Sequence, residues 1–182
     1  QTQRITRIVQ SLIRFAHTGQ HDLQQSQESI NLHELVGEAI HLVSLDIRGK
    51  QQQLHNQVPA ELIICGDLQH LLQVFVNLLN NACDASAIQT NVWITAETTD
   101  NSVVIHITDE GSGIPPEHQQ KIFEPFFTTK DPDKGTGLGL PLVYNIIEEH
   151  YGSINIVSPA NKKQNKGTRV VITLPRSPQD TH

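Results

Sequence analysis

Apolar residues in the first twenty positions recur with the spacing of a packed helix. They are three, four and three residues apart, as in an a-and-d seam, and Gly19 is a typical stop. Because one helix with a single apolar stripe cannot bury that stripe alone, the pattern predicts a partner helix or a second subunit. The polar, glutamine-rich residues 20–29 that follow are typical of a linker. The seam residues are Ile5, Ile8, Leu12 and Phe15.

From residue 30 onward the periodicity predicts a mixture of helices and strands. A helix is predicted over 32–43 after Asn31, a good N-cap, and a long helix with a wide apolar face follows Asp67. Residues 92–98 and 103–108 alternate as the strands of a hairpin do. The other predicted elements are strands at 54–58, 62–65, 153–158 and 168–174, and helices at 117–121 and 140–149. Together they predict an α+β fold, a two-layer sandwich preceded by one long helix.

Charge and composition narrow the class of protein. The 13 Lys and Arg against 19 Asp and Glu give a formal net charge of −6, which argues against a nucleic-acid-binding protein. The sequence has neither an apolar run long enough for a membrane span nor a signal peptide. Cys65 and Cys83 lack a CxxC partner and are expected to be buried apolar residues of a reducing compartment. The absence of Met leads us to expect a piece of a longer protein.

Two asparagines on the long helix form the first candidate site. Asn77 and Asn81 are four residues apart, so their side chains project from one helix face. Asparagine is unfavourable inside helices, and its carbonyl oxygen is a hard ligand that suits Mg²⁺. The alternative is that both amides bond a neighbouring loop.

A carboxylate followed by two glycines forms the second candidate site. In the run from Asp109 to Pro115, Asp109 lies where a strand is predicted to end. It could accept a hydrogen bond from an exocyclic amine, while Gly111 and Gly113 let a flat ring approach. The alternative is an ordinary turn.

The third and fourth clusters are adjacent. The Gly-Thr-Gly-Leu-Gly-Leu run at 135–140 leads into a helix, where free backbone N–H groups can bind phosphate. It lacks both the preceding strand of a Rossmann fingerprint and the Gly-Lys-Ser/Thr of a Walker A loop. The aromatic run at 123–127 is typical of a core, but directly before a glycine loop it also suits the anchor of a mobile lid carrying Lys130 and Lys134. Surface lysines are the alternative.

Taken in chain order, the asparagine cluster (77–86), the Asp109 cluster (109–115), the aromatic run (123–130) and the glycine run (135–140) resemble the N, G1, F and G2 boxes of sensor histidine kinases. The resemblance extends over about residues 1–176, and Gly167–Pro175 is similar to the last strand of that family. It implies the Bergerat ATP-binding fold, a mixed and mainly antiparallel sheet covered by helices, shared with DNA gyrase, mismatch-repair ATPases and certain heat-shock chaperones. It also implies four segments. These are part of the second helix of a dimerisation and phosphoacceptor hairpin (1–22), a linker (23–30), the ATP-binding domain (31–176) and a tail (177–182).

Carried over by position, the resemblance assigns roles. Asn81 is the expected Mg²⁺ ligand and, with Lys130, a catalytic residue, while Asp109 is expected to read the adenine amino group. Family members often carry a lysine at position 84, so Asp84 leaves that phosphate contact open and Lys130 is a candidate to replace it. The predicted nucleotide-binding residues are Asn77, Asn81, Asp84, Asp109, Gly111, Gly113, Ile114, Phe123, Thr129, Lys130, Gly135, Thr136, Gly137, Leu138, Gly139, Leu140 and Thr168.

The implied activity is transfer of the γ-phosphoryl group of Mg-ATP to a histidine, for relay to an aspartate of a response regulator. Hydrolysing relatives carry a glutamate where this chain has Asn77, an amide that cannot take the proton of water at neutral pH. His33-Glu34 lacks the sequence context of the acceptor, which we expect on the hairpin upstream of Gln1. The resemblance further implies a homodimer and a cytoplasmic domain, whose parent can be anchored in the inner membrane. An ATPase of this fold, or a non-catalytic or phosphatase-biased regulator, remains an alternative.

Overall fold

The computed structural model describes residues 27–45, 52–131 and 135–176. The predicted N-terminal helix, most of the predicted linker, the tail and Lys134 lie outside these ranges. The strands are β1 (Glu28–Asn31), β2 (Gln53–Gln57), β3 (Ile63–Gly66), β4 (Asn91–Thr98), β5 (Ser102–Asp109), β6 (Ser153–Val157) and β7 (Arg169–Pro175). The helices are α2 (Leu32–Ser44), α3 (Leu68–Ala85), α4 (Pro116–Gln119) and α5 (Gly139–Glu149).

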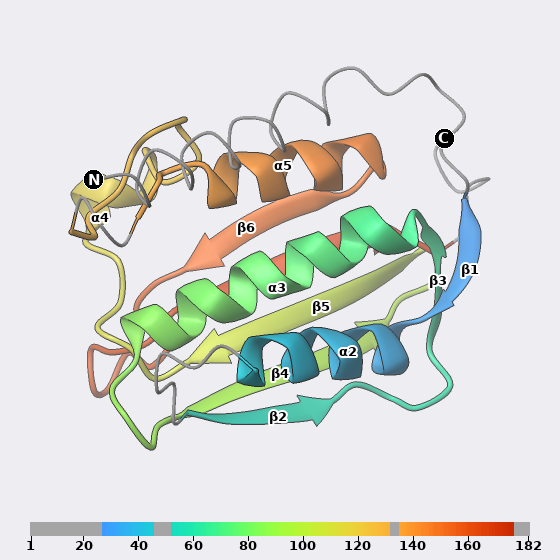
Figure 1. Cartoon of the computed structure of the whole chain (residues 1–182), viewed down its shortest axis with the longest axis horizontal. Coiled ribbons are helices and arrows are strands. Elements are labelled where there is room, and N and C mark those ends of the chain that lie inside the picture. The colour runs from blue at the N-terminus through green and yellow to red at the C-terminus, as the bar shows by residue number, and fades with distance from the viewer. Residues whose placement is uncertain (1–26, 46–51, 132–134, 177–182) are drawn as a thin grey trace.

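One layer of the fold is a five-stranded sheet and the other is helical. The strands are ordered β2-β4-β5-β7-β6, with β2 parallel to β4 and every other pair antiparallel. Helices α2, α3 and α5 lie on one face of this sheet, with α3 in the middle (Figure 1). The predicted α+β two-layer sandwich with a mainly antiparallel sheet is confirmed.

Helix α3 is fixed at both of its ends. The Asp67 side chain caps the first turn by accepting from the backbone N–H of His70 at 2.9 Å. At the other end the Gln52 side-chain amide donates to three carbonyl oxygens at 3.1–3.2 Å, which satisfies acceptors that a helix end leaves open. The apolar face between these caps is buried in the core. Those three oxygens belong to Cys83, Ser86 and Ala87.

The alternation of β5 carries a carboxylate into the interior. Every second residue of the strand is buried, from Val103 through Ile105 and Ile107 to Asp109. Successive strand residues point to opposite faces, so Asp109 lies on the same face as the core residues before it. A strict period of two therefore places the one acidic side chain of that face at the end of the strand.

The last residues of the predicted linker, 28–30, lie in a strand. They form β1, which pairs antiparallel with β3 and places Ile30 opposite Ile64, both buried. Only one of these three residues is apolar, so the local pattern did not indicate a strand. Cys65 and Cys83 form no disulfide, and Cys83 is buried while Cys65 is half-buried. Among the described residues no helix is both long and apolar enough to cross a bilayer.

Candidate functional site

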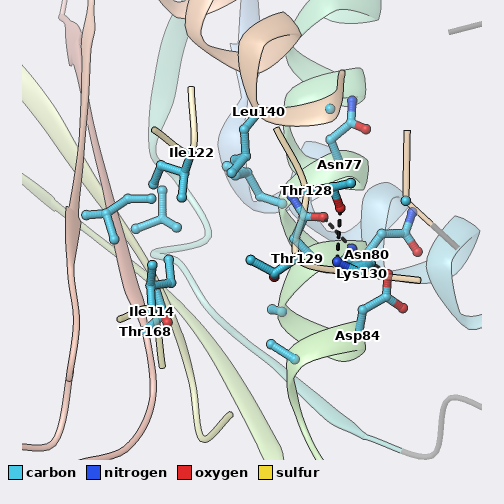
Figure 2. Close-up of a pocket in the computed structure, with 18 of the residues that line it drawn as sticks. Asn77, Asn80, Asp84, Ile114, Ile122, Thr128, Thr129, Lys130, Leu140 and Thr168 are labelled. Carbon is cyan, nitrogen blue, oxygen red and sulfur yellow. Dashed lines mark hydrogen bonds and ion pairs between the residues drawn. The ribbon is translucent and has the colours of Figure 1, made fainter. Parts of the chain in front are cut away.

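A cavity of about 340 Å³ lies between α3, the end of β5, the start of β7 and the segments that connect α4 to α5. Its two sides differ in chemistry: Ile114, Ile122 and Thr168 lie on one side, and Asn77, Asp84 and Lys130 lie on the other (Figure 2). Fourteen of the predicted binding residues line it, which brings together segments far apart in the sequence. These are Asn77, Asn81, Asp84, Asp109, Gly113, Ile114, Thr129, Lys130, Gly135, Thr136, Gly137, Gly139, Leu140 and Thr168.

Asp109 is the carboxylate on the apolar side of the cavity. Its side chain is only 7% exposed, and Oδ1 accepts from the backbone N–H groups of Gly111 at 2.8 Å and Thr168 at 3.1 Å. These two bonds fix the carboxyl plane and leave Oδ2 as the oxygen available to a ligand. Ile107 and Val170 line the same cavity, so this side offers a mainly apolar surface with one carboxylate.

Burial raises the pKa of Asp109 above its usual value, and the bonds from Gly111 and Thr168 partly oppose that shift. Desolvation penalises the charged carboxylate, whereas N–H donors favour it. The protonation state of Asp109 should therefore depend on whether water or a ligand fills the cavity.

Gly111, one of the predicted binding residues, lies against the end of α3. It does not line the cavity, because it packs against the end of α3, where an added Cβ would lie 2.6 Å from the carbonyl oxygen of Ala85. The backbone N–H of Ser112 donates to that same oxygen at 3.2 Å. Gly111 thus holds the loop of Asp109 against α3 and orients the carboxylate. Gly113 does line the cavity, with a φ of +78° that favours glycine.

The polar side is built on one face of α3. Asn77, Asn80, Asn81 and Asp84 all line the cavity, so the predicted shared face of Asn77 and Asn81 is confirmed. The Nδ2 of Asn77 donates to the carbonyl oxygen of Gln73 at 3.0 Å, which leaves Oδ1 facing Gly139, where an added Cβ would lie 3.4 Å from it. This face therefore offers amide oxygens and one carboxylate to the cavity.

Lys130 joins the segment after α4 to this face. Its Nζ donates to Oδ1 of Asn81 at 3.0 Å and to Oδ2 of Asp84 at 2.8 Å (Figure 2). The amide and carboxylate oxygens are hard donors that suit Mg²⁺, and here both already bind a cationic group. The described residues contain no group of three or more His, Cys, Asp or Glu side chains that could hold a metal. The donor set fits a cation whose other ligands come from a phosphate group.

The glycine segment, residues 135–140, borders the polar side of the cavity and leads into α5. Gly137 has a φ of +69°, and its carbonyl oxygen accepts from the backbone N–H of Phe126 at 2.8 Å. Helix α5 starts at Gly139 with Pro141 in its first turn, so its unbonded N–H groups and dipole lie next to the cavity. Such a helix start favours an anion.

Two more predicted binding residues lie outside the cavity lining. Leu138 is 2% exposed and packs inside the protein, between two glycines that line the cavity. Phe123 packs against the core and against Tyr144, with ring centroids 5.5 Å apart. Both residues support segments beside the cavity and do not line it. Their apolar side chains already indicated burial as the simpler explanation.

Other lining residues were not predicted. Asn80 precedes Asn81 and is not indicated by the four-residue spacing of Asn77 and Asn81, and Thr128 precedes the predicted Thr129. His118 and Phe127 lie edge to face with ring centroids 5.4 Å apart. No spacing rule links His118, which lies in the short helix α4, to Phe127, which follows that helix.

Comparisons with known proteins show which family the chain matches. Residues 66–178 match the family described as "Histidine kinase-, DNA gyrase B-, and HSP90-like ATPase". "Sensor histidine kinase ZraS" of Salmonella typhi is 36% identical over 177 residues, which are 96% of this chain and 36% of that protein. "Sporulation kinase A" of Bacillus subtilis is 36% identical over 174 residues, which are 95% of this chain and 27% of that protein. The chain thus spans about a third of the length of these curated relatives.

Solved structures agree with the sequence comparison. A nucleotide-free catalytic domain of the histidine kinase ThkA superimposes with a TM-score of 0.74 at 32% identity, covering 85% of this chain and 98% of that one. The mycobacterial sensor histidine kinase MprB gives a TM-score of 0.72 at 28% identity, covering 82% of this chain and 97% of that one. The arrangement of helices on the sheet is therefore that of a histidine kinase catalytic domain.

Proposed function

This chain belongs to the family of histidine kinase-, DNA gyrase B- and HSP90-like ATPases, as a histidine kinase ATP-binding domain, and we propose that it binds Mg-ATP and transfers the γ-phosphoryl group to a protein histidine. The acceptor histidine would belong to a dimerisation hairpin, and an aspartate of a response regulator would receive the group next. We further propose that the parent protein works as a homodimer with this domain in the cytoplasm.

The geometry of Asp109 is the observation that carries the proposal. An apolar slot that ends in one buried carboxylate, with Oδ1 held by two N–H groups, leaves a single acceptor at Oδ2. The exocyclic amine of adenine is a donor that fits this acceptor, and the apolar lining suits a flat ring. The polar side, with Lys130 and the start of α5, would then face the phosphates.

The residues of the polar side would position and neutralise the triphosphate. Asn81 would hold Mg²⁺, which when bound neutralises phosphate charge and orients the transferred group. Lys130 and the N–H groups at Gly139 would bind phosphate oxygens. The nitrogen of the acceptor histidine would form a bond to the γ-phosphorus as the bond to the β–γ bridging oxygen breaks, and ADP would leave with that oxygen.

The carboxylates of the cavity favour transfer over hydrolysis. Only Asp84 and Asp109 line it among the described residues; Asp109 belongs to the base side, and Asp84 is paired with Lys130. Asn77 lies where a base would activate water, and its amide cannot accept a proton at neutral pH. His33 does not line the cavity, and its Nδ1 lies 2.7 Å from the carbonyl oxygen of Val58. We therefore infer an acceptor other than His33.

The direct test is a transfer assay. This chain is incubated with γ-labelled ATP and a separately produced dimerisation hairpin of a related kinase, and the expected product is a labelled hairpin whose phosphate is lost in acid. The control hairpin carries glutamine at its acceptor histidine and should stay unlabelled. Steady phosphate release without transfer would contradict the proposal and select an ATPase. ATP binding with neither outcome would select a non-catalytic regulator.

Asp109 also predicts opposite pH dependences for binding and for stability. Its pKa in the folded protein lies above the usual 3.8, so its contribution to folding is fully present below pH 3.8 and is lost as the pH rises through the raised value. ATP affinity should fall as the pH is lowered through that value, by up to about tenfold per pH unit, because protonated Oδ2 no longer accepts from the amine.

Calorimetric titration with a non-hydrolysable ATP analogue and thermal unfolding, each from pH 7 downward, measure the two trends. In Asp109→Asn the contribution of this group to both trends should disappear. An affinity that follows the same pH curve in the wild type and in Asp109→Asn would contradict this role of Asp109.

A further inference from the structure

Two oxygen atoms of α3 converge on a single cationic atom in the cavity. Oδ1 of Asn81 and Oδ2 of Asp84 lie 3.0 Å and 2.8 Å from Nζ of Lys130. The two oxygen-bearing residues are three positions apart on α3 and so share one face of the helix. A point that two protein oxygens reach together, and where a positive charge already lies, has the form of a cation site.

We propose that Asn81 and Asp84 together form the protein's half of the divalent-cation site, and that the Lys130 ammonium occupies this site until a metal–nucleotide complex binds. The inference rests on the proposed function, because phosphate oxygens of the nucleotide would supply the remaining ligands. It gives Asp84 a role as a second protein ligand, directly or through a water molecule.

The chemistry of the two side chains supports this role. Mg²⁺ is commonly held by one or two protein oxygens together with phosphate and water, and a carboxylate adds the negative charge that an amide lacks. Two protein oxygens are too few to retain Mg²⁺ alone, which agrees with the absence of any larger ligand cluster among the residues described. The site should therefore bind metal strongly only when a nucleotide is present.

The contact with Lys130 must break when the metal binds. An ammonium and a divalent cation repel each other, so they do not share the same oxygen pair. The side chains of Lys130 and Asp84 are 33% and 35% exposed, and an ion pair this accessible to water is weak and readily exchanged. Once released, Lys130 has the phosphate oxygens as its nearest new partners, so the segment that carries it would move from α3 to the nucleotide.

The competing explanation is that Asp84 only holds Lys130 in place and so opposes nucleotide binding. The two explanations predict opposite effects of removing the charge at position 84. If Asp84 is a metal ligand, its loss raises the amount of Mg²⁺ needed. If Asp84 is only an anchor for Lys130, its loss frees Lys130 and tightens the binding of Mg-nucleotide.

The first test is Asp84→Asn in this chain, with Mg²⁺ titrated against a fluorescent, non-hydrolysable ATP analogue. We expect the Mg²⁺ concentration for half-maximal binding to rise about tenfold. Binding of the analogue in EDTA should not weaken, which shows that the variant is folded. Asp100→Asn is the matched control, because it removes the same charge from the exposed turn between β4 and β5. An unchanged or lowered Mg²⁺ requirement in Asp84→Asn would overturn the proposal.

The second test needs no nucleotide and therefore separates this proposal from the proposed function. Lys130→Met removes the resident ammonium, so the electron paramagnetic resonance of free Mn²⁺ should show binding that is weak but about tenfold tighter than in the wild type. The double variant Lys130→Met/Asp84→Asn should lose this gain, and Lys121→Met, at an exposed lysine outside the cavity, should not show it. Equal Mn²⁺ binding by Lys130→Met and the wild type would overturn the proposal, whereas failure of the wild type to bind the analogue at any Mg²⁺ concentration would overturn the proposed function.

Discussion

Asp109→Asn should weaken binding of a non-hydrolysable ATP analogue by about 1–3 kcal/mol, roughly 5-fold to 150-fold in Kd. The physical reason is the fixed orientation of the carboxyl group. Oδ1 accepts from the N–H groups of Gly111 and Thr168, so the amide oxygen of the asparagine would take that position. Its NH₂ group would then face the adenine amine, and a hydrogen bond would be replaced by two opposed donors.

Calorimetry with ATP and GTP analogues measures the effect and its direction. The wild type should prefer ATP by about the same factor, because guanine presents a carbonyl oxygen where adenine presents its amine, and Asp109→Asn should reduce this preference. Glu110→Gln is the matched control. It removes a charge from the next residue in the chain. The Glu110 carboxylate accepts from the backbone N–H of Asn91 at 2.8 Å and does not line the cavity. Equal binding of ATP and GTP by the wild type would show that Asp109 does not read the base.

Gly137→Ala should remove most nucleotide binding and destabilise the fold. The φ of +69° costs a residue with a side chain about 1–2 kcal/mol. An added Cβ would also lie 2.6 Å and 2.7 Å from Cα and O of Phe126. These are backbone atoms of a neighbouring segment, so the glycine segment has to move, and with it the start of α5. We expect affinity for the ATP analogue to fall about a hundredfold, since about 3 kcal/mol of strain would accompany the bound conformation.

The matched control for this prediction lies in α2. Gly37→Ala adds the same methyl group, but the new Cβ would have only the Asn56 side chain at 4.0 Å near it. Alanine is the better residue inside a helix, so Gly37→Ala should bind nucleotide normally and unfold at an equal or higher temperature. Thermal unfolding and calorimetry on both variants provide the comparison, and normal affinity in Gly137→Ala would show that the cavity tolerates a displaced glycine segment.

Features set by neighbouring residues could be predicted from the sequence. The Asp67 cap, the apolar face of α3 and the alternation that ends in Asp109 each depend on contacts within a few positions. The common face of Asn77 and Asn81 follows directly from the helix period. Each glycine of the G1 and G2 boxes was also identified, although the structure divides them into those that line the cavity and one, Gly111, that packs behind it.

Features that depend on distant partners could not be predicted in this way. Strand β1 exists because Ile30 pairs opposite Ile64, and the other three positions of the strand are polar and give no local signal of that pairing. The bond between Lys130 and Asp84 joins residues 46 positions apart, so only the fold shows that the departure at position 84 meets this lysine. The contact of His118 with Phe127 depends in the same way on how the chain turns after α4.

Helix α3 sets a fixed distance between the two regions of the cavity that it supports. Its last turn supports the loop of Asp109 through the carbonyl oxygen of Ala85, and its middle carries Asn77 and Asn81. A capped helix does not change length, so the distance between the residues proposed to bind the base and those proposed to bind the phosphates would stay constant during turnover. Release of the ADP product would then depend on the segment that carries Lys130, whose ammonium would leave the phosphate and return to the oxygens of Asn81 and Asp84.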